Sequence, residues 1–166
     1  MTLEKNKEPK PVQDPRNYIF ITNDAGWDVM TPATQIVSAL ASKNYWLASD
    51  RTPYKKLYQR GDRVLFYVAG TKARYFKGCA LISGPIAPAT DQEKLAAEDL
   101  GLEGFEERIP LESVVLWEKT PLLKPLVEDL EFIKDKQNYG LHLRQAAAQI
   151  SNSDYDLIVA AAKSNQ

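Results

Sequence analysis

The sequence Arg-Val-Leu-Phe-Tyr-Val-Ala, residues 63–69, has the strongest strand signal in the chain. A short run of β-branched and aromatic residues without polar alternation is typical of a central strand buried on both faces. Residues 70–72 (Gly-Thr-Lys) provide a turn, and residues 74–83 are predicted to return as the neighbouring strand. Gly78, inside that second strand, indicates a bulge or close packing. We therefore expect a β-hairpin at the centre of the fold.

Further strands and helices are predicted on both sides of this hairpin. Residues 18–22 (Tyr-Ile-Phe-Ile-Thr) have strand composition and end in turn residues. The aromatic segment 44–49 indicates a strand or extended loop, and residues 107–119 contain another strand. Thr31 and Pro32 fit the N-cap and first position of a helix. Additional helices are predicted at residues 52–59, 91–101, 143–150 and 151–164.

The order of these elements, β, α, several β and then α, predicts an α+β fold. Five or six short strands, mostly antiparallel and with a glycine bulge, can curl into a small β-barrel flanked by helices. Residues 1–16 contain three prolines and seven charged residues without hydrophobic periodicity, so we expect a flexible leader there. The remaining residues, 17–166, are predicted to form one domain, because a chain of this length buries its own core.

The composition favours a protein of the reducing cytoplasm. Cys79 is the single cysteine, so neither an intramolecular disulfide nor a zinc site of several thiolates is expected. The N-terminal residues are charged rather than apolar, unlike a signal peptide. The apolar runs are far shorter than the roughly 20 residues that a membrane-spanning helix needs, so no membrane partner is expected.

The charges are unevenly distributed, although the formal net charge is only −1. Residues 46–77 contain eight basic and two acidic side chains, whereas residues 91–131 contain twelve acidic and four basic ones. The first region has the sign that meets a phosphate backbone, and the second repels one. The alternative is that both regions are solvated faces of a nearly neutral protein.

The usual catalytic motifs are missing, which favours a binding module over an enzyme. His142 is the single histidine, so a metal site with two histidines is not expected. No nucleophile elbow of the form Gly-x-Ser-x-Gly is present, and no glycine-rich loop of the two common nucleotide-binding types. Cys79 lies in a predicted strand, as a small buried side chain would. We expect no catalytic residue, no metal and no cofactor.

Three features follow one another in an informative order. A strand ends in Thr22-Asn23-Asp24, an aromatic segment with Trp46 precedes Gly61-Asp62 and the strong strand, and Phe-Ile-Lys-Asp-Lys-Gln-Asn-Tyr-Gly (132–140) precedes the last helix. This order resembles the EVE domain family, within the PUA-like superfamily that also holds the YTH and ASCH domains. The resemblance covers most of residues 18–158 and is best at 45–83 and 130–158.

The resemblance implies a barrel-like PUA-type fold with a pocket for one flipped-out, modified base, most often a methylated one. Trp46 matches an aromatic wall of that pocket, and Tyr139 lies where relatives often carry a second aromatic, so we expect the two rings to face each other. Thr22 and Asn23 match polar groups that read the base edge, and Ser49 is expected near the pocket floor. Basic side chains are expected to hold the nucleic-acid backbone; they are Arg51, Lys55, Lys56, Arg63 and Arg144.

The energetics are compatible with this site. Extruding a base costs a few kcal/mol, and stacking on an aromatic side chain returns roughly 1–3 kcal/mol. Each residue also has a structural alternative. Trp46 and Tyr139 have alternative roles as packing residues and Asn23 as a turn former, and Arg144 has Asp135 or Asp154 as alternative partners. If Trp46 serves the pocket, replacing it with alanine is expected to abolish binding at a modest cost in stability.

The predicted function is therefore non-catalytic recognition of a modified base in DNA or RNA. The predicted partners are such a nucleic acid and an effector protein, for example a nuclease or a helicase. Two alternatives stay open. One is a small-ligand or protein-interaction domain of the same fold without nucleic-acid binding, and the other is an enzyme that acts on a modified base in the same pocket.

Overall fold

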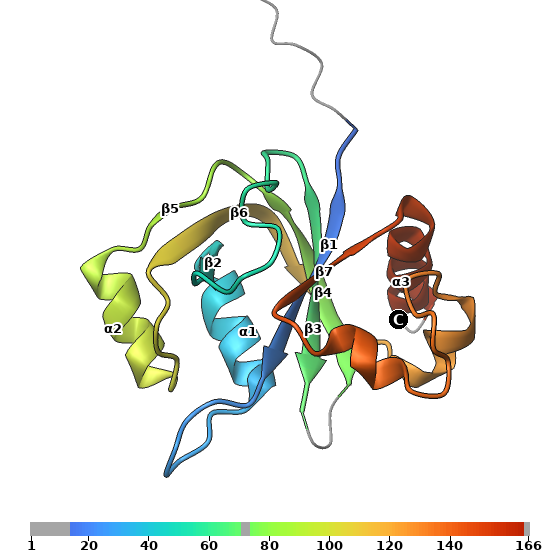
Figure 1. Cartoon of the computed structure of the whole chain (residues 1–166), viewed down its shortest axis with the longest axis horizontal. Coiled ribbons are helices and arrows are strands. Elements are labelled where there is room, and N and C mark those ends of the chain that lie inside the picture. The colour runs from blue at the N-terminus through green and yellow to red at the C-terminus, as the bar shows by residue number, and fades with distance from the viewer. Residues whose placement is uncertain (1–13, 71–73, 165–166) are drawn as a thin grey trace, which may run out of the picture.

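A strongly curled sheet forms the centre of the computed structural model, which describes residues 14–70 and 74–164 (Figure 1). Within those residues the sheet has seven strands in the order β2-β6-β4-β3-β1-β7, with β5 paired to β6. The strands are β1 (Asn17–Asn23), β2 (Tyr45–Ala48), β3 (Arg63–Ala69), β4 (Tyr75–Ile82), β5 (Ala87–Pro88), β6 (Glu107–Leu116) and β7 (Ala147–Ile150).

The helices lie on the two sides of this sheet. In Figure 1, α1 (Ala33–Ala41) and α2 (Asp91–Asp99) lie on the left and α3 (Asn152–Ser164) on the right. The 3-10 helices η2 (Lys124–Asp129) and η3 (Tyr139–Leu143) accompany α3. This arrangement confirms the predicted α+β fold. Residues 1–13 of the expected leader (1–16) and residues 71 and 72 of the expected turn (70–72) lie outside the described residues.

The predicted central strand occupies the centre of the sheet. Strand β3 pairs in parallel with β1 and antiparallel with β4, and Val64 to Val68 are all buried. Alternate side chains enter two different cores, because successive residues of a strand point to opposite faces. Phe66 belongs to the core on the α1 side, and Leu65 and Tyr67 to the core on the α3 side. We call these the α1-side core and the α3-side core.

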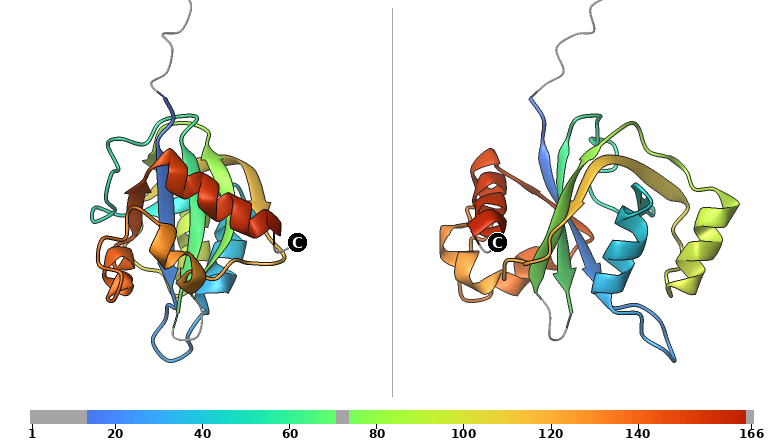
Figure 2. Two further views of the ribbon diagram at one scale, coloured as in Figure 1. Left: turned by 90° about the vertical axis from the view of Figure 1, so that its right-hand side faces the viewer. Right: turned by 180° about the vertical axis from the view of Figure 1, so that it is seen from behind.

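The curl of the sheet comes from β6 and from the contact at Gly78. The first half of β6 pairs with β2 and β5 and its second half with β4, so this one strand joins two parts of the sheet. Figure 2 shows β6 arching around α1. A Cβ atom added at Gly78 would collide with the carbonyl oxygen of Val115, and the β3–β4 register shifts beside this glycine. The predicted bulge and close packing at Gly78 are confirmed.

Three helix predictions need correction. Thr31 does not cap α1; the Asp24 carboxylate accepts the N–H of Ala33 at 2.7 Å, and Pro32 precedes the helix. Residues 52–59 form turns rather than a helix, with Tyr54 at a φ of 65°. The segment 143–150, also predicted as helical, contains β7, which pairs with β1. The C-terminal helix, in contrast, is confirmed as α3. Among the described residues, no helix combines the length and apolar character needed to span a membrane.

Candidate functional site

A cavity of about 330 Å³ opens where β1 ends, beside β2 and α1. This volume lies at the lower end of the range of small-ligand pockets. Its walls are mainly apolar, and they include Phe20, Ile36, Leu40, Trp46, Leu102 and Phe105. Polar groups also line it, namely Thr22, Asn23, Asp24, Thr52, Arg144 and Gln145. We call it the Trp46 cavity.

Trp46 forms a wall of this cavity and is also part of the α1-side core. Its side chain is 8% exposed, and its ring stacks on Phe20 with the centroids 5.6 Å apart. The Phe66 ring packs against it at 5.2 Å. Trp46 therefore both lines a cavity and packs in the core, and its role in binding a base stays a prediction. Since the ring fills space between two buried aromatic side chains, replacing it with alanine is expected to cost more stability than the sequence alone suggested.

Thr22 lines the cavity and carries a buried hydroxyl. The residue is 7% exposed, and its Oγ1 is buried without a hydrogen-bond partner among the described residues. Thr22 shares a face of β1 with Phe20, which places its side chain on the same side as Trp46. A buried polar group without a partner costs about 1–3 kcal/mol. A ligand that pairs with this hydroxyl would recover that cost.

Asn23 lies beside Thr22 at the mouth of the cavity and is exposed. It is the last residue of β1 and pairs with Ala69, so it is a strand residue and not the turn former that the sequence left open. Its amide offers both a donor and an acceptor. The neighbouring Asp24 also lines the cavity, although one of its oxygens is engaged by α1.

The wall contributed by Leu102 and Phe105 was missed by sequence reasoning. Both residues lie between α2 and β6, in the strongly acidic part of the chain. Gly101, with a φ of 81°, turns the chain there and packs against the backbone of Gly26. A signal was present, because Leu102 and Phe105 are apolar residues within a glycine-containing loop (Gly-Leu-Glu-Gly-Phe) that is otherwise acidic.

Ser49 acts beside the cavity rather than in it. Its backbone N–H donates to Thr52 Oγ1 at 2.9 Å, and its own Oγ accepts from the N–H of Arg51 at 3.2 Å. Thr52, rather than Ser49, lines the cavity. The expectation that Ser49 lies near the pocket floor is therefore replaced by a supporting role in which Ser49 fixes the turn that carries Thr52.

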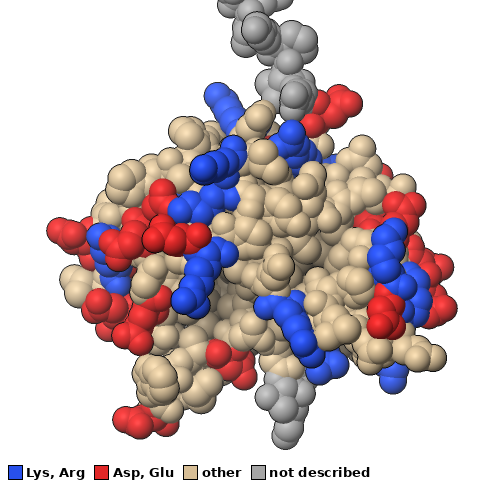
Figure 3. Space-filling model, viewed as in Figure 1, with Lys and Arg blue, Asp and Glu red and all other residues tan. Residues whose placement is uncertain are grey.

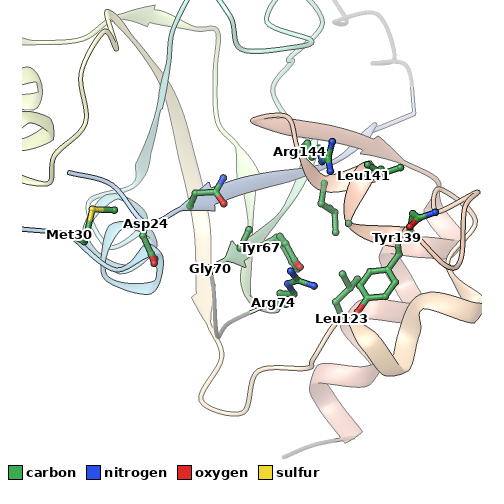
Figure 4. A pocket seen from close by; sticks show the side chains of 14 residues that line it. Asp24, Met30, Tyr67, Gly70, Arg74, Leu123, Tyr139, Leu141 and Arg144 are labelled. Atoms are coloured by element: carbon green, nitrogen blue, oxygen red, sulfur yellow. The ribbon is translucent and has the colours of Figure 1, made fainter. Parts of the chain in front are cut away.

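Tyr139 does not face Trp46. It lines a second cavity of about 800 Å³ (Figure 4). Tyr139 packs against the α3-side core, whereas Trp46 belongs to the α1-side core. The expected slot between the two rings is wrong, because η3 carries Tyr139 to the other face of the sheet. We call this second space the Tyr139 cavity. Asn23, Asp24 and Arg144 line both cavities, so the two are adjacent.

The predicted backbone-binding residues divide into two groups. Lys55 forms ion pairs with Glu107 and, at 3.8 Å, with Asp50. Arg63 binds Asn17 and lies over the Tyr155 ring, so it serves the fold. These contacts argue against the expected roles of Lys55 and Arg63 at a phosphate backbone.

Arg51, Lys56 and Arg144 are exposed, and no ion pair engages them within the part of the chain that the structure describes. Their role at a nucleic-acid backbone stays a prediction. Neither alternative partner of Arg144 forms an ion pair with it among the described residues; Asp154 and Asp135 accept backbone N–H groups instead. Figure 3 shows one face of the molecule, viewed as in Figure 1. Lys and Arg side chains run along the middle of that face, and most acidic side chains lie toward its sides.

Replacing Arg63 tests its structural role. Arg63→Met removes the 2.7 Å bond from Arg63 Nε to Asn17 Oδ1 and the contact 4.0 Å above the Tyr155 ring centroid. The free energy of unfolding is expected to fall by about 1–3 kcal/mol. Affinity for nucleic acid is expected to match that of Arg60→Met, a control at an exposed arginine in the preceding turn. A selective loss of affinity in the Arg63 variant would return this residue to the binding surface.

The other reactive side chains lie outside the Trp46 cavity lining. His142 Nε2 accepts the N–H of Asp135 at 3.1 Å. Burial raises the pKa of the Cys79 thiol, which keeps it in its less reactive protonated form. Among residues 14–70 and 74–164, no three His, Cys, Asp or Glu side chains group in a way that could hold a metal ion.

Comparison with known proteins gives structural similarity without detectable sequence similarity. No protein-family model and no curated protein matches the sequence. A hypothetical protein from Leishmania major is similar in structure, with a TM-score of 0.60, 15% identity, and coverage of 91% of this chain and 96% of that one. Human THYN1, solved with DNA that contains 5-methylcytosine, has a TM-score of 0.58, 12% identity, and coverage of 89% and 98%.

A third similar structure is the YTH domain of Zygosaccharomyces rouxii MRB1, solved with N6-methyladenosine RNA. Its TM-score is 0.58, its identity is 11%, and the match covers 95% of each chain. At such identities the likeness establishes a shared fold over nearly the whole length of each molecule.

Proposed function

We propose that this chain, which has the EVE-type PUA-like fold that its sequence predicted, binds nucleic acid by taking one modified base into the Trp46 cavity. Two structures of the same fold hold methylated nucleic acids, DNA with 5-methylcytosine in human THYN1 and RNA with N6-methyladenosine in the YTH domain of Zygosaccharomyces rouxii MRB1. The observation that carries the proposal is the buried, unpaired Thr22 hydroxyl in a cavity with aromatic and aliphatic walls.

The lining suits a planar heterocycle that is apolar on its faces and polar on its edge. Trp46, Leu102 and Phe105 offer apolar surface, and Thr22 and Asn23 offer hydrogen bonds near the end of β1. Stacking on an aromatic ring returns roughly 1–3 kcal/mol, which offsets much of the cost of extruding a base. Apolar walls also favour a methylated base, since burying one methyl group contributes about 0.8 kcal/mol.

The methyl contribution alone gives only about a fourfold preference, so base identity has to be read by hydrogen bonds. A site that pairs with a base edge rejects a ligand that leaves its buried polar group unpaired. Thr22 is the buried member of this set and Asn23 the exposed one. We therefore assign the discrimination between bases mainly to Thr22.

Replacing Thr22 with valine tests this assignment. Thr22→Val keeps the shape of the side chain and removes the hydroxyl, so affinity for the preferred modified base is expected to fall about tenfold. Stability is expected to stay equal or to rise, because the variant removes a buried hydroxyl that has no protein partner. Thr22→Ser, which keeps the hydroxyl, is the matched control.

The measurement is a titration of single strands and duplexes, in DNA and in RNA, that differ only in one base. Cytosine is compared with 5-methylcytosine, and adenine with N6-methyladenine. One modified strand is expected to bind more tightly than its unmodified partner in the wild-type protein and in Thr22→Ser. Equal affinities for every modified and unmodified pair would exclude the proposed function, and unchanged binding by Thr22→Val would exclude the role of Thr22.

A further inference from the structure

We propose that the Tyr139 cavity binds the nucleotide next to the modified one in the same strand, with its phosphate between Arg74 and Arg144 and its base against Tyr139. This inference rests on the proposed function. The two cavities share three lining residues, Asn23, Asp24 and Arg144, at the end of β1 and at the start of the segment leading to β7. A nucleic-acid strand that leaves the Trp46 cavity past these residues enters the Tyr139 cavity directly.

The Tyr139 cavity carries an excess of positive charge. Arg74 and Arg144 are both exposed, and neither has an ion pair among residues 14–70 and 74–164. Among the described residues that line this cavity, Asp24 is the one carboxylate, and its Oδ1 already accepts the Ala33 N–H. Guanidinium groups bind phosphate oxygens through charge-assisted hydrogen bonds. The charge and the donors therefore suit one phosphate group.

The backbone fixes Arg74 in an uncommon conformation. Its φ is 95°, a region that residues other than glycine rarely adopt. The N–H of Arg74 donates to the Val68 carbonyl at 2.9 Å, and its own carbonyl accepts the Leu123 N–H at 3.0 Å. Such conformations persist where the surrounding structure holds them, and they gather at binding sites. The two hydrogen bonds hold the residue at the rim of the cavity.

Aromatic side chains complete the lining. In Figure 4, the Arg74 guanidinium lies beside the Tyr67 hydroxyl, and the Tyr139 ring lies next to Leu123. Burial raises the pKa of Tyr67 to about 12, and the nearby Arg74 charge opposes that rise. Tyr67 therefore stays protonated at neutral pH and can donate to an oxygen of the ligand. The half-buried Tyr139 offers a ring on which any base can stack.

The position of Arg144 between the two cavities also fits this inference. This residue lines both cavities, so it lies at the boundary that a phosphodiester link between the two nucleotides would cross. The Tyr139 cavity, at about 800 Å³, is larger than the 330 Å³ Trp46 cavity. The larger space suits a base with its phosphate, and the smaller one suits a base alone.

The test compares ligands of increasing length. The preferred modified base is supplied as a nucleoside, as dinucleotides with the modified base at either end, and as a trinucleotide. One dinucleotide is expected to bind at least tenfold more tightly than the nucleoside. Tyr139→Leu and Arg74→Gln are each expected to remove most of this gain and to leave nucleoside affinity unchanged. Arg60→Gln is the matched control, and Thr22→Val is expected to weaken all modified ligands alike.

The outcomes separate this inference from the proposed function. A dinucleotide that binds no better than the nucleoside would overturn the inference alone, and so would equal losses for both ligands in Tyr139→Leu. A free nucleoside monophosphate that binds as tightly as the dinucleotide, with the same dependence on Arg74, would overturn the assignment to a strand. Binding of unmodified dinucleotides that depends on Tyr139, without any preference for modification, would support the cavity and overturn the proposed function. No binding of any of these ligands would overturn both.

Discussion

Trp46→Ala is expected to lower the free energy of unfolding by about 3–5 kcal/mol, the usual cost of removing a large aromatic side chain from a core. The Trp46 ring is 8% exposed and packs against Phe20 and Phe66, both of which are buried. Its removal would join a new void to the existing cavity and leave two aromatic rings without a neighbour. Urea-induced unfolding, followed by circular dichroism, measures the change.

This cost decides how the Trp46 cavity has to be tested. Loss of binding in Trp46→Ala does not separate a pocket role from a core role, because the variant protein is expected to be partly unfolded. Trp46→Phe keeps an aromatic ring and is expected to cost less stability, so its affinity for the modified base is the informative one. A Trp46→Ala variant as stable as wild type would contradict the packing of the Trp46 ring between Phe20 and Phe66.

The fold was predictable where the pattern of apolar residues was compatible with a single position in the sheet. Strand β3 (Arg63–Ala69) is apolar on both faces, and only a central position between two cores satisfies that pattern. Helix α3 was predictable from its polar start and apolar face. The segment 143–150 was not, because Ala, Arg and Gln favour a helix, whereas pairing with the edge of β1 selects a strand. Tertiary hydrogen bonding outweighed local propensity there.

Similar limits applied to residues 52–59, where Pro53 and the positive φ of Tyr54 interrupt a helix. The Tyr58 hydroxyl donates to the Pro53 carbonyl at 2.8 Å, and its ring packs edge-on against Tyr18. This packing belongs to the tertiary structure, since Tyr18 is on β1. The sequence pattern of residues 52–59 alone therefore does not predict the contact between Tyr58 and Tyr18.

The site was predictable on the strands and not on the loops. Thr22, Asn23 and Trp46 meet at one cavity because β1 and β2 have a definite register and alternation. Leu102, Phe105 and Tyr139 lie outside the strands, and their placement depends on how those connecting segments pack against the sheet. The resemblance therefore located one wall of the cavity and misplaced the other.

Asp154→Ala is expected to lower the free energy of unfolding by about 2–5 kcal/mol, since it leaves two part-buried backbone N–H donors without their acceptors. Asp154 is 1% exposed, and its oxygens accept from the N–H groups of Glu131 at 2.8 Å and Phe132 at 2.9 Å. Its own N–H donates to Ser151 Oγ, which donates in turn to the Glu131 carboxylate. One carboxylate thus ties the first turn of α3 to the segment that leads to Tyr139.

Asp154→Asn is the matched control, because its side-chain oxygen retains one of the two acceptor positions. Its cost is expected to be smaller than that of alanine, as measured by thermal and urea unfolding. Since residues 131–138 lead to η3, amide hydrogen exchange is expected to quicken there before it quickens in β3. Uniform acceleration across both segments would mean that Asp154 supports the whole fold. Faster exchange confined to residues 131–138 would show that the Asp154 carboxylate mainly positions the segment that carries Tyr139. The pattern of apolar residues along the chain does not predict this role.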